Sequence, residues 1–270
     1  MEELKEITGN AAEIIAALAT DKAQSLGIAT KVAMVPVGYT LQGLEKFRQA
    51  PDRKRGRVTV EDTGSIIRYI NNHKEDGVSQ IFASPDDGVV ACVLDYHGVN
   101  VAGSPGWKDH VVEYKPGLSD DVKPWIEKMD QPLSQTEFAE HIEANIHTVS
   151  KPAGADLLTQ VENISIARNV KINRRIRRQD GSIAFSFTDE DAQNGEGRLP
   201  PEIQITAPLY RHGGIVTLTL RLQYRTGEGG KLAILYTIDR WEQIKDAAFL
   251  DIAMKVEEET KLPMYLGIVR

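Results

Sequence analysis

The sequence predicts an α+β protein with a mixed N-terminal sheet and its helices, a central helical segment, and a C-terminal antiparallel meander covered by a long helix. Three observations support this class. Residues 215–224 alternate between apolar and polar side chains, which is typical of a strand with one solvent-facing side. Residues 240–259 carry apolar side chains at helical spacing. The chain is 270 residues long and 41% hydrophobic, so it can bury a core without disulfide bonds.

An N-terminal arm, residues 1–30, precedes the first sheet. Apolar residues at helical spacing predict an amphipathic helix at 10–24 within this arm. The region 31–118 then mixes helices with strands. Strands are predicted at 31–37, 57–60, 80–83, 89–96 and 110–114, and helices at 41–47 and 61–72. The Pro, Asp and Gly residues of 84–88 predict a hairpin between the strands on either side, with 110–114 as a third strand of the same sheet.

Helical patterns dominate the central segment, residues 119–163. The run Ser134-Gln-Thr-Glu137 is a capping box, which predicts that a helix begins there. Phe138, Ile142 and Ile146 follow at helical spacing. This pattern indicates structure and carries no information about function.

The C-terminal region, residues 164–270, returns to strands. Strands are predicted at 164–178, 182–187, 215–224, 232–238 and, as a short edge strand, 263–267. The turn residues at 179–181 predict a hairpin between the first two of these. We expect the amphipathic helix 240–259 to cover this meander.

Composition excludes several classes of protein. The net charge of −7 and the pI near 5.5 argue against a protein whose main task is to coat nucleic acid. The single cysteine, Cys92, allows no disulfide within the chain and favours a reducing compartment. No run approaches the roughly 18 apolar residues that a membrane span needs, and the acidic N-terminus lacks the features of a signal peptide. We therefore expect a cytoplasmic protein without membrane contact.

Two carboxylates and two imidazoles lie close together in the sequence. They form the candidate metal site Asp95, His97, Asp109 and His110. Oxygen and nitrogen ligands in this mixture suit a hydrolytic divalent cation. Their spacing matches no established ligand signature, however, and Lys108 adds positive charge. We favour the alternative, in which Asp95 and His97 lock the end of the strand, Trp107 packs over the glycine-rich loop, and Asp109 and His110 orient that loop by hydrogen bonds.

Other catalytic chemistry lacks its motifs in this sequence. There is no Gly-x-Ser-x-Gly elbow, and Cys92 lies in the middle of a predicted strand, where a thiol is normally inert. The glycine-rich connection at 98–106 lacks the spacing and the lysine of a phosphate-binding loop. We assign no catalytic residue and no cofactor, and an enzyme is the less favoured expectation.

A basic strand is the candidate nucleic-acid or subunit interface. Its cationic residues are Lys171, Arg174, Arg175, Arg177 and Arg178. Alternation along a strand puts Arg175 and Arg177 on one side and divides the patch between two faces. Aromatic residues for base stacking are sparse nearby. A salt-bridged contact between subunits is therefore favoured over contact with DNA or RNA.

Several motifs, in order and spacing, support a resemblance to a known family. They are Arg57-Val-Thr-Val60, residues 65–71, Ile81-Phe-Ala83, Val93-Leu-Asp-Tyr-His97, Trp107-Lys-Asp-His110, Ser134-Gln-Thr-Glu-Phe-Ala139, residues 220–224 and Thr260-Lys-Leu-Pro263. Over residues 32–267 the chain resembles the YfdQ-like family of phage and prophage proteins, a domain family of unknown function. The resemblance implies a phage origin, a bacterial cytoplasm, and a setting near recombination or replication functions. It supplies no catalytic residues.

Together these observations predict a non-enzymatic phage accessory protein that assembles with itself and modulates phage DNA metabolism or a host process by binding. Segregated charge, the N-terminal arm and an apolar C-terminal strand support self-assembly. Two alternatives are a metal-dependent hydrolase that uses the Asp/His cluster and a nucleic-acid-binding protein that uses the basic strand. Besides a second copy of the chain, the possible partners under these hypotheses are nucleic acid and a host protein.

Overall fold

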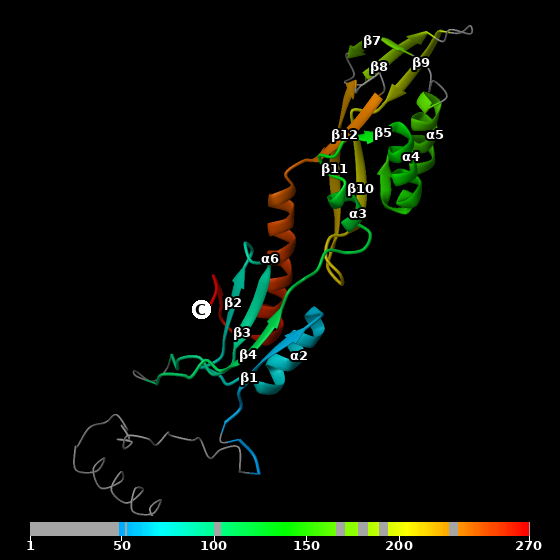
Figure 1. The fold of residues 1–270 in the computed structure, drawn as a ribbon. Coiled ribbons are helices and arrows are strands. Elements are labelled where there is room, and N and C mark those ends of the chain that lie inside the picture. Colours follow the sequence, from blue (N-terminus) through cyan, green and yellow to red (C-terminus); the bar gives the residue numbers. More distant parts are fainter. Residues whose placement is uncertain are drawn as a thin grey trace, which may run out of the picture. The chain divides into compact units, whose positions relative to one another are not determined.

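The computed structural model describes most of the chain after residue 48. The described residues are 49–51, 53–99, 104–165, 171–177, 183–188, 194–226 and 232–269 (Figure 1). The elements predicted at 10–24, 31–37 and 41–47 lie outside these residues. The chain divides into two units, Met1–Lys54 and Arg55–Arg270, and the sheets formed by the described residues belong to the second.

The first sheet has five strands in the order β1-β4-β3-β2-β13 (Figure 1). They are β1 (Gly56–Val60), β2 (Gln80–Ser84), β3 (Val89–Val93), β4 (His110–Tyr114) and β13 (Met264–Leu266). The pairs β2–β3 and β3–β4 are antiparallel, which confirms the predicted hairpin and its third strand. β1 lies parallel to β4, and β13 lies parallel to β2, so crossover connections supply both edges of the sheet.

Two helices pack on one face of the first sheet (Figure 1). α2 (Thr63–His73) begins where the Asp62 carboxylate accepts the N–H of Ser65 at 2.8 Å. α6 (Trp241–Thr260) contacts α2 and β2, and the Lys74 ammonium donates to the Thr260 carbonyl at 2.6 Å. The α+β class is confirmed. The helix that we expected over the C-terminal meander instead packs on α2 and β2, because an amphipathic pattern identifies a face to bury and not the sheet that buries it.

The second sheet is antiparallel throughout, in the order β5-β12-β11-β10-β6. Its strands are β5 (Leu133–Ser134), β6 (Val149–Lys151), β10 (Glu202–Pro208), β11 (Ile215–Thr226) and β12 (Leu232–Ile238). In β11, Leu218 and Leu220 are buried while Thr217 and Arg221 are exposed, which confirms the predicted alternation. β5 and β6 come from the segment that we predicted as helical, so this segment forms part of the second sheet.

Three α-helices and a short 3-10 helix accompany the second sheet. They are α3 (Lys123–Glu127), α4 (Gln135–Ala144), η2 (Ile146–Thr148) and α5 (Gly154–Ser165). The capping box before α4 is confirmed: the Ser134 hydroxyl accepts the N–H of Glu137 at 3.3 Å, and the Glu137 carboxylate accepts the N–H of Ser134 at 2.7 Å. This reciprocal pair satisfies two N–H groups at the start of α4.

A third, three-stranded sheet contains the basic strand. Its strands are β7 (Lys171–Arg177), β8 (Ile183–Thr188) and β9 (Asn194–Leu199), and both pairings are antiparallel. The predicted hairpin of strands is thus confirmed by its pairing. The first strand begins later than we predicted, because α5 continues to Ser165.

Candidate functional site

The Asp95 carboxylate holds together the two ends of a loop. We had expected Asp95 on the strand, within 89–96. β3 instead ends at Val93, so Asp95 lies in the turn that follows it. Its Oδ2 accepts the N–H of Asp109 at 3.0 Å, and its Oδ1 accepts the N–H of His110 at 2.9 Å. The carboxylate therefore pins the start of β4 to the end of β3.

His97 and Gly106 complete this loop base, by which we mean residues 95–99 and 104–109. The His97 Nδ1 accepts the N–H of Gly106 at 3.0 Å. A Cβ at position 106 would lie 2.1 Å from the carbonyl oxygens of Asp95 and Tyr96, so only glycine fits this close approach. Lys108 adopts a φ of 60°, in the left-handed region. The loop base is thus tightly constrained around its hydrogen bonds.

His110 turns to helix α2. It is 6% exposed, and its Nε2 lies 3.0 Å from the Tyr69 hydroxyl. The His73 ring meets the His110 ring edge-on, with 5.5 Å between centroids. Sequence reasoning missed Tyr69 and His73. Their spacing of four residues places them on one side of a helix, but nothing local indicated that this side faces β4.

The side chains of Asp95, His97 and His110 thus serve hydrogen bonds of the loop base and its contact with α2, and Asp109 donates its backbone N–H to Asp95. Among the residues that the structure describes, no group of three or more His, Cys, Asp or Glu side chains could hold a metal ion. This geometry favours the structural interpretation of Asp95, His97 and His110. Trp107 is 73% exposed, and residues 100–103 of the glycine-rich loop lie outside the described residues, so its packing over that loop stays a prediction.

The side of the first sheet opposite α2 and α6 carries a group of apolar residues, of which Val89, Val93 and Val111 are themselves buried. We call this side the open face, and its apolar residues are Phe82, Val89, Ala91, Val93 and Val111. Their neighbours along each strand, such as Ile81, Val90 and Val112, belong to the main core cluster. The five residues of the open face do not belong to it. Alternation along the strands therefore puts them on the other side of the sheet.

A hollow of about 150 Å³ lies on the open face. The five apolar residues of the open face line it, together with the C-terminal tail Gly267–Val269. Its rim carries charge of both signs: Arg57 forms an ion pair with Glu113, and Lys108 comes from the loop base. The hollow is therefore an apolar site with a charged rim, formed where the tail and the loop base meet the sheet.

Aromatic rings follow one border of the open face. Tyr265 of β13 stacks on Phe82 of β2 with 5.6 Å between centroids and 27° between planes. Phe82 in turn contacts Tyr96, at 5.2 Å between centroids. The Lys108 ammonium lies 5.2 Å from the centre of the Tyr96 ring, within the range of a cation–π contact. The tail, the sheet edge and the loop base therefore share one surface.

The basic strand is confirmed only as backbone. β7 contains Lys171, Arg174, Arg175 and Arg177, and Arg178 lies outside the described residues. The pairing with β8 shifts between Ile172 and Arg174, which indicates a bulge. From Arg174 to Arg177 the backbone register with β8 is regular.

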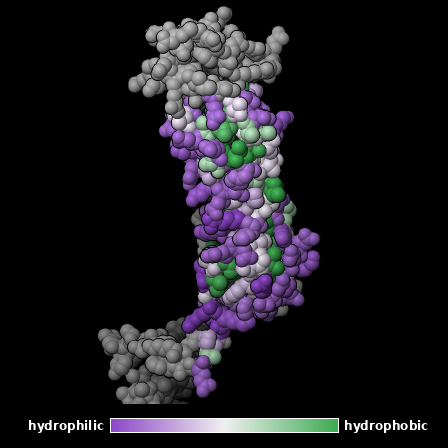
Figure 2. All heavy atoms as spheres, turned by 90° about the vertical axis from the view of Figure 1, so that its right-hand side faces the viewer, coloured by the Kyte–Doolittle hydropathy of each residue, from purple (hydrophilic) through white to green (hydrophobic). Residues whose placement is uncertain are grey.

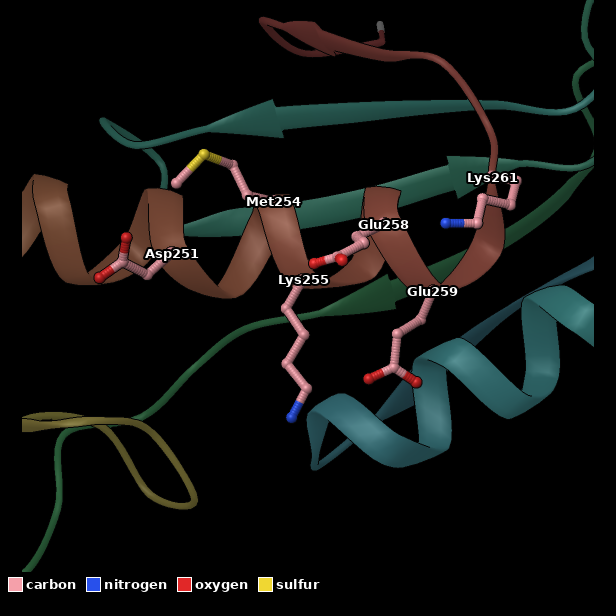
Figure 3. Close-up of a pocket in the computed structure, with 6 residues that line it drawn as sticks. All are labelled: Asp251, Met254, Lys255, Glu258, Glu259 and Lys261. Atoms are coloured by element: carbon pink, nitrogen blue, oxygen red, sulfur yellow. The ribbon is translucent and has the colours of Figure 1, made fainter.

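A depression on α6 offers no comparable site. Its lining residues are Asp251, Met254, Lys255, Glu258, Glu259 and Lys261. All of them come from this one helix and its C-terminal end, and their side chains spread around its outer side (Figure 3). Charges of alternating sign on one helix are typical of a solvated face. The side of the molecule turned to the viewer in Figure 2 is likewise mostly hydrophilic, with small separate hydrophobic areas.

A half-buried histidine, His141 of α4, lies beside the second sheet. The His141 ring stacks on Tyr236 at an angle of 10°, and Trp125 meets it edge-on with 4.5 Å between centroids. The Tyr236 hydroxyl donates to the Trp125 carbonyl at 2.8 Å. Burial lowers the pKa of His141 to about 4, so this side chain is neutral at pH 7. This cluster closes the core and borders no cavity that we identify among the described residues.

The buried thiol of Cys92 is unreactive in this setting. Cys92 is 0% exposed in the middle of β3, and burial raises the pKa of the thiol to about 12. At neutral pH the thiolate is therefore scarce, as the sequence position predicted.

Comparison with known proteins yields a family and no activity. A family model described as an uncharacterized conserved protein (DUF2303) matches residues 5–269. Neither the curated proteins nor the solved structures contain a match. Within the described residues, no helix has the length and apolar character needed to cross a membrane.

Proposed function

We propose, from the premise that this chain belongs to the uncharacterized conserved family DUF2303, that it is a non-enzymatic protein which assembles with itself and acts by binding. One observation carries this proposal. Eight large hydrophobic side chains are exposed among the described residues, and five of them lie in the loop base, in β13 or in the C-terminal tail. These five are Val99, Trp107, Tyr265, Leu266 and Ile268.

Such a concentration of exposed apolar side chains supports an interaction surface. Apolar residues scattered singly over a surface need no explanation, whereas a contiguous group with a polar rim is typical of a binding site. Lys108 and Ile268 line the same hollow, so the loop base and the tail border one surface. β13 is also an edge strand with a single hydrogen-bonded neighbour, β2, among the described strands. Exposed edges of this kind favour pairing with another chain.

The resemblance to YfdQ-like phage and prophage proteins extends the proposal to a biological role. In this proposal the assembled protein works in the bacterial cytoplasm and modulates phage DNA metabolism or a host process by binding. The cationic positions of β7 are the part of the chain that suits contact with nucleic acid or with another subunit. Retention on DNA that weakens with salt, and that Arg175→Glu with Arg177→Glu abolishes, is the expected sign of the nucleic-acid alternative.

The metal-dependent hydrolase is the weaker alternative. Asp95 and His97 already accept backbone N–H groups, and His110 contacts Tyr69. Metal that co-purifies with the protein, and that is lost on Asp95→Ala, would restore this alternative. Protein that binds no Zn²⁺ or Mn²⁺ on titration removes it.

Light scattering of the purified full chain tests self-assembly, with absorbance at 260 and 280 nm recorded across the same peak. We expect a uniform, nucleic-acid-free particle heavier than the 29.9 kDa monomer. Leu266→Lys should reduce its mass, because the Leu266 side chain is 68% exposed in the proposed surface. Ile215→Lys is the matched control, since Ile215 is 72% exposed on the second sheet. A wild-type monomer, or equal effects of both substitutions, contradicts the proposal.

A further inference from the structure

We infer that Trp107 of one copy of this chain inserts into the hollow of a second copy, in a two-fold contact that both copies make reciprocally. The inference rests on the proposed self-assembly and names the residues that form its interface. It follows from the size of the hollow, the presentation of Trp107 and the self-complementarity of the surface that carries both.

The hollow has the size and lining that suit an aromatic ring. Its volume is about 150 Å³, and its floor consists of the five apolar residues of the open face. An apolar cavity of about 150 Å³ holds a benzene-sized group. Ser84 is the uncharged polar residue of the lining, and its hydroxyl already donates to Asp87 at 2.6 Å. A ring can therefore enter without leaving the Ser84 hydroxyl unpaired.

The loop base presents Trp107 in a constrained conformation. On one side of it, the N–H of Gly106 is bonded to His97, and on the other the N–H groups of Asp109 and His110 are bonded to Asp95. Lys108, the next residue, has a left-handed backbone, and such strain is often found at functional sites. An exposed aromatic side chain on a preorganised backbone loses little conformational entropy on binding and is typical of an interface hot spot.

A second copy is the occupant that these features favour. Lys108 lines the hollow, and Trp107 precedes it in the chain, so the inserting residue and the receiving site share one surface. A two-fold contact requires the inserting residue and the receiving site to lie on one surface, because each copy contributes the same surface to the interface. The rim also carries both signs of charge, with Lys108 and Arg57 against Glu113, and therefore allows the cation of one copy to face the carboxylate of the other.

The expected buried area agrees with a weak dimer. Each buried tryptophan removes about 150–250 Å² from solvent, so two reciprocal insertions bury roughly 300–500 Å². A specific interface needs about 1,200 Å² in total. The exposed side chains of Tyr265, Leu266 and Ile268, together with the charged rim, must supply the remainder. The dimer should therefore form and dissociate with concentration in the micromolar range.

The test compares dimer dissociation constants of full-length variants, measured by light scattering and sedimentation over a dilution series. Trp107→Ser removes the inserting ring, and we expect the dissociation constant to rise at least about 30-fold. Trp107→Phe keeps a ring and should raise it less than about 10-fold. Ala91→Phe fills the hollow from its floor and should weaken the dimer as Trp107→Ser does. Ile215→Ser, which removes an exposed apolar residue elsewhere, is the control.

Tryptophan fluorescence tests the insertion without relying on the folding of a filled-hollow variant. The emission of Trp107, taken as the difference between wild-type protein and Trp107→Phe, should shift to shorter wavelength as the protein associates. An assembly that survives Trp107→Ser unchanged, or a Trp107 emission that does not move on association, overturns the insertion and leaves self-assembly standing. A wild-type protein that stays monomeric at every concentration overturns both.

Discussion

The first and second sheets treat their outward faces differently. On β11 of the second sheet the outward residues that follow the exposed Ile215 are mostly polar. The Thr217 hydroxyl lies 3.1 Å from the Thr206 hydroxyl of β10, and Arg221 pairs with Asp239, directly after β12, at 3.1 Å. On the first sheet the outward residues of β3 are Val89, Ala91 and Val93. A strand that is apolar on both sides is typical of a sheet that is covered on both faces.

The two sheets also differ in what covers their outward faces. On the outer face of the second sheet, side chains such as Thr206, Thr217 and Arg221 make hydrogen bonds and ion pairs with one another and with neighbouring residues. The first sheet has helices on one face only, and its own tail and loop base leave the hollow of about 150 Å³ on the other. The apolar open face and the exposed residues around it are the features on which the proposed binding through the first sheet rests.

We expect the largest loss of stability from a substitution in the core beside the second sheet. Trp125→Ala removes a fully buried ring, its edge-on contact with His141, and the indole N–H bond to the Thr148 hydroxyl at 3.0 Å. We expect the free energy of unfolding to fall by about 3–5 kcal/mol in urea titrations. On the open face, Phe82→Ala should cost about 1 kcal/mol, because Phe82 is only partly buried. Equal losses would contradict the distinction between the two sheets.

Acid should destabilise the second sheet through His141. Burial lowers the pKa of His141 from 6.5 to about 4, so the unfolded chain binds a proton that the folded chain excludes between about pH 6.5 and pH 4. The free energy of unfolding should therefore fall as the pH falls through this window. The loss due to His141 should be about 2 kcal/mol, since partial exposure reduces the full linkage.

The matched variant for this pH effect is His141→Gln, which keeps a polar side chain beside the Tyr236 hydroxyl but does not titrate. The measurement is the free energy of unfolding at pH 7 and pH 4.5 for both proteins. A variant that loses as much stability on acidification as the wild-type protein would assign the pH dependence to other groups.

A smaller effect should appear at the loop base of the first sheet. Asp95→Ala leaves the N–H groups of Asp109 and His110 without their carboxylate acceptor. We expect a loss of about 1 kcal/mol, because water can replace part of this bonding. Hydrogen exchange of these two amides should accelerate, whereas the amides of α4 should keep their protection. Unchanged exchange at both amides would show that the carboxylate does not hold the loop.

The smallest effect should come from the solvent-facing side of the second sheet. Thr217→Gln replaces one exposed polar side chain by another, and the free energy of unfolding should change by less than about 0.5 kcal/mol. Its assembly state by light scattering should also match that of the wild-type protein. A Thr217→Gln protein that dissociates would move the interaction surface from the first sheet to the second.

Local patterns predicted much of the fold. The hairpin β2–β3, the capping box at Ser134 and the alternation of β11 depend on residues close together in the sequence, and all three are present. At the candidate site, the sequence identified Asp95, His97 and His110 as partners of the loop. Tyr69 and His73 escaped notice, because their contact with His110 joins residues about 40 positions apart.

The sequence by itself determined many of the elements, such as α2, the hairpin β2–β3 and the alternating strand β11, because helical and strand periods, caps and turns act over a few residues. It did not predict β5, β6, β9 or β10. Only the tertiary structure decided which sheet α6 packs on, that β1 and β13 join the first sheet as parallel edges, and that Lys108 and Ile268 line one hollow. These relations join distant segments through nonlocal backbone pairing and packing of apolar faces. The sequence pattern shows which face of an element is apolar but not which other element packs on that face. The shapes of the packed side chains decide this in three dimensions.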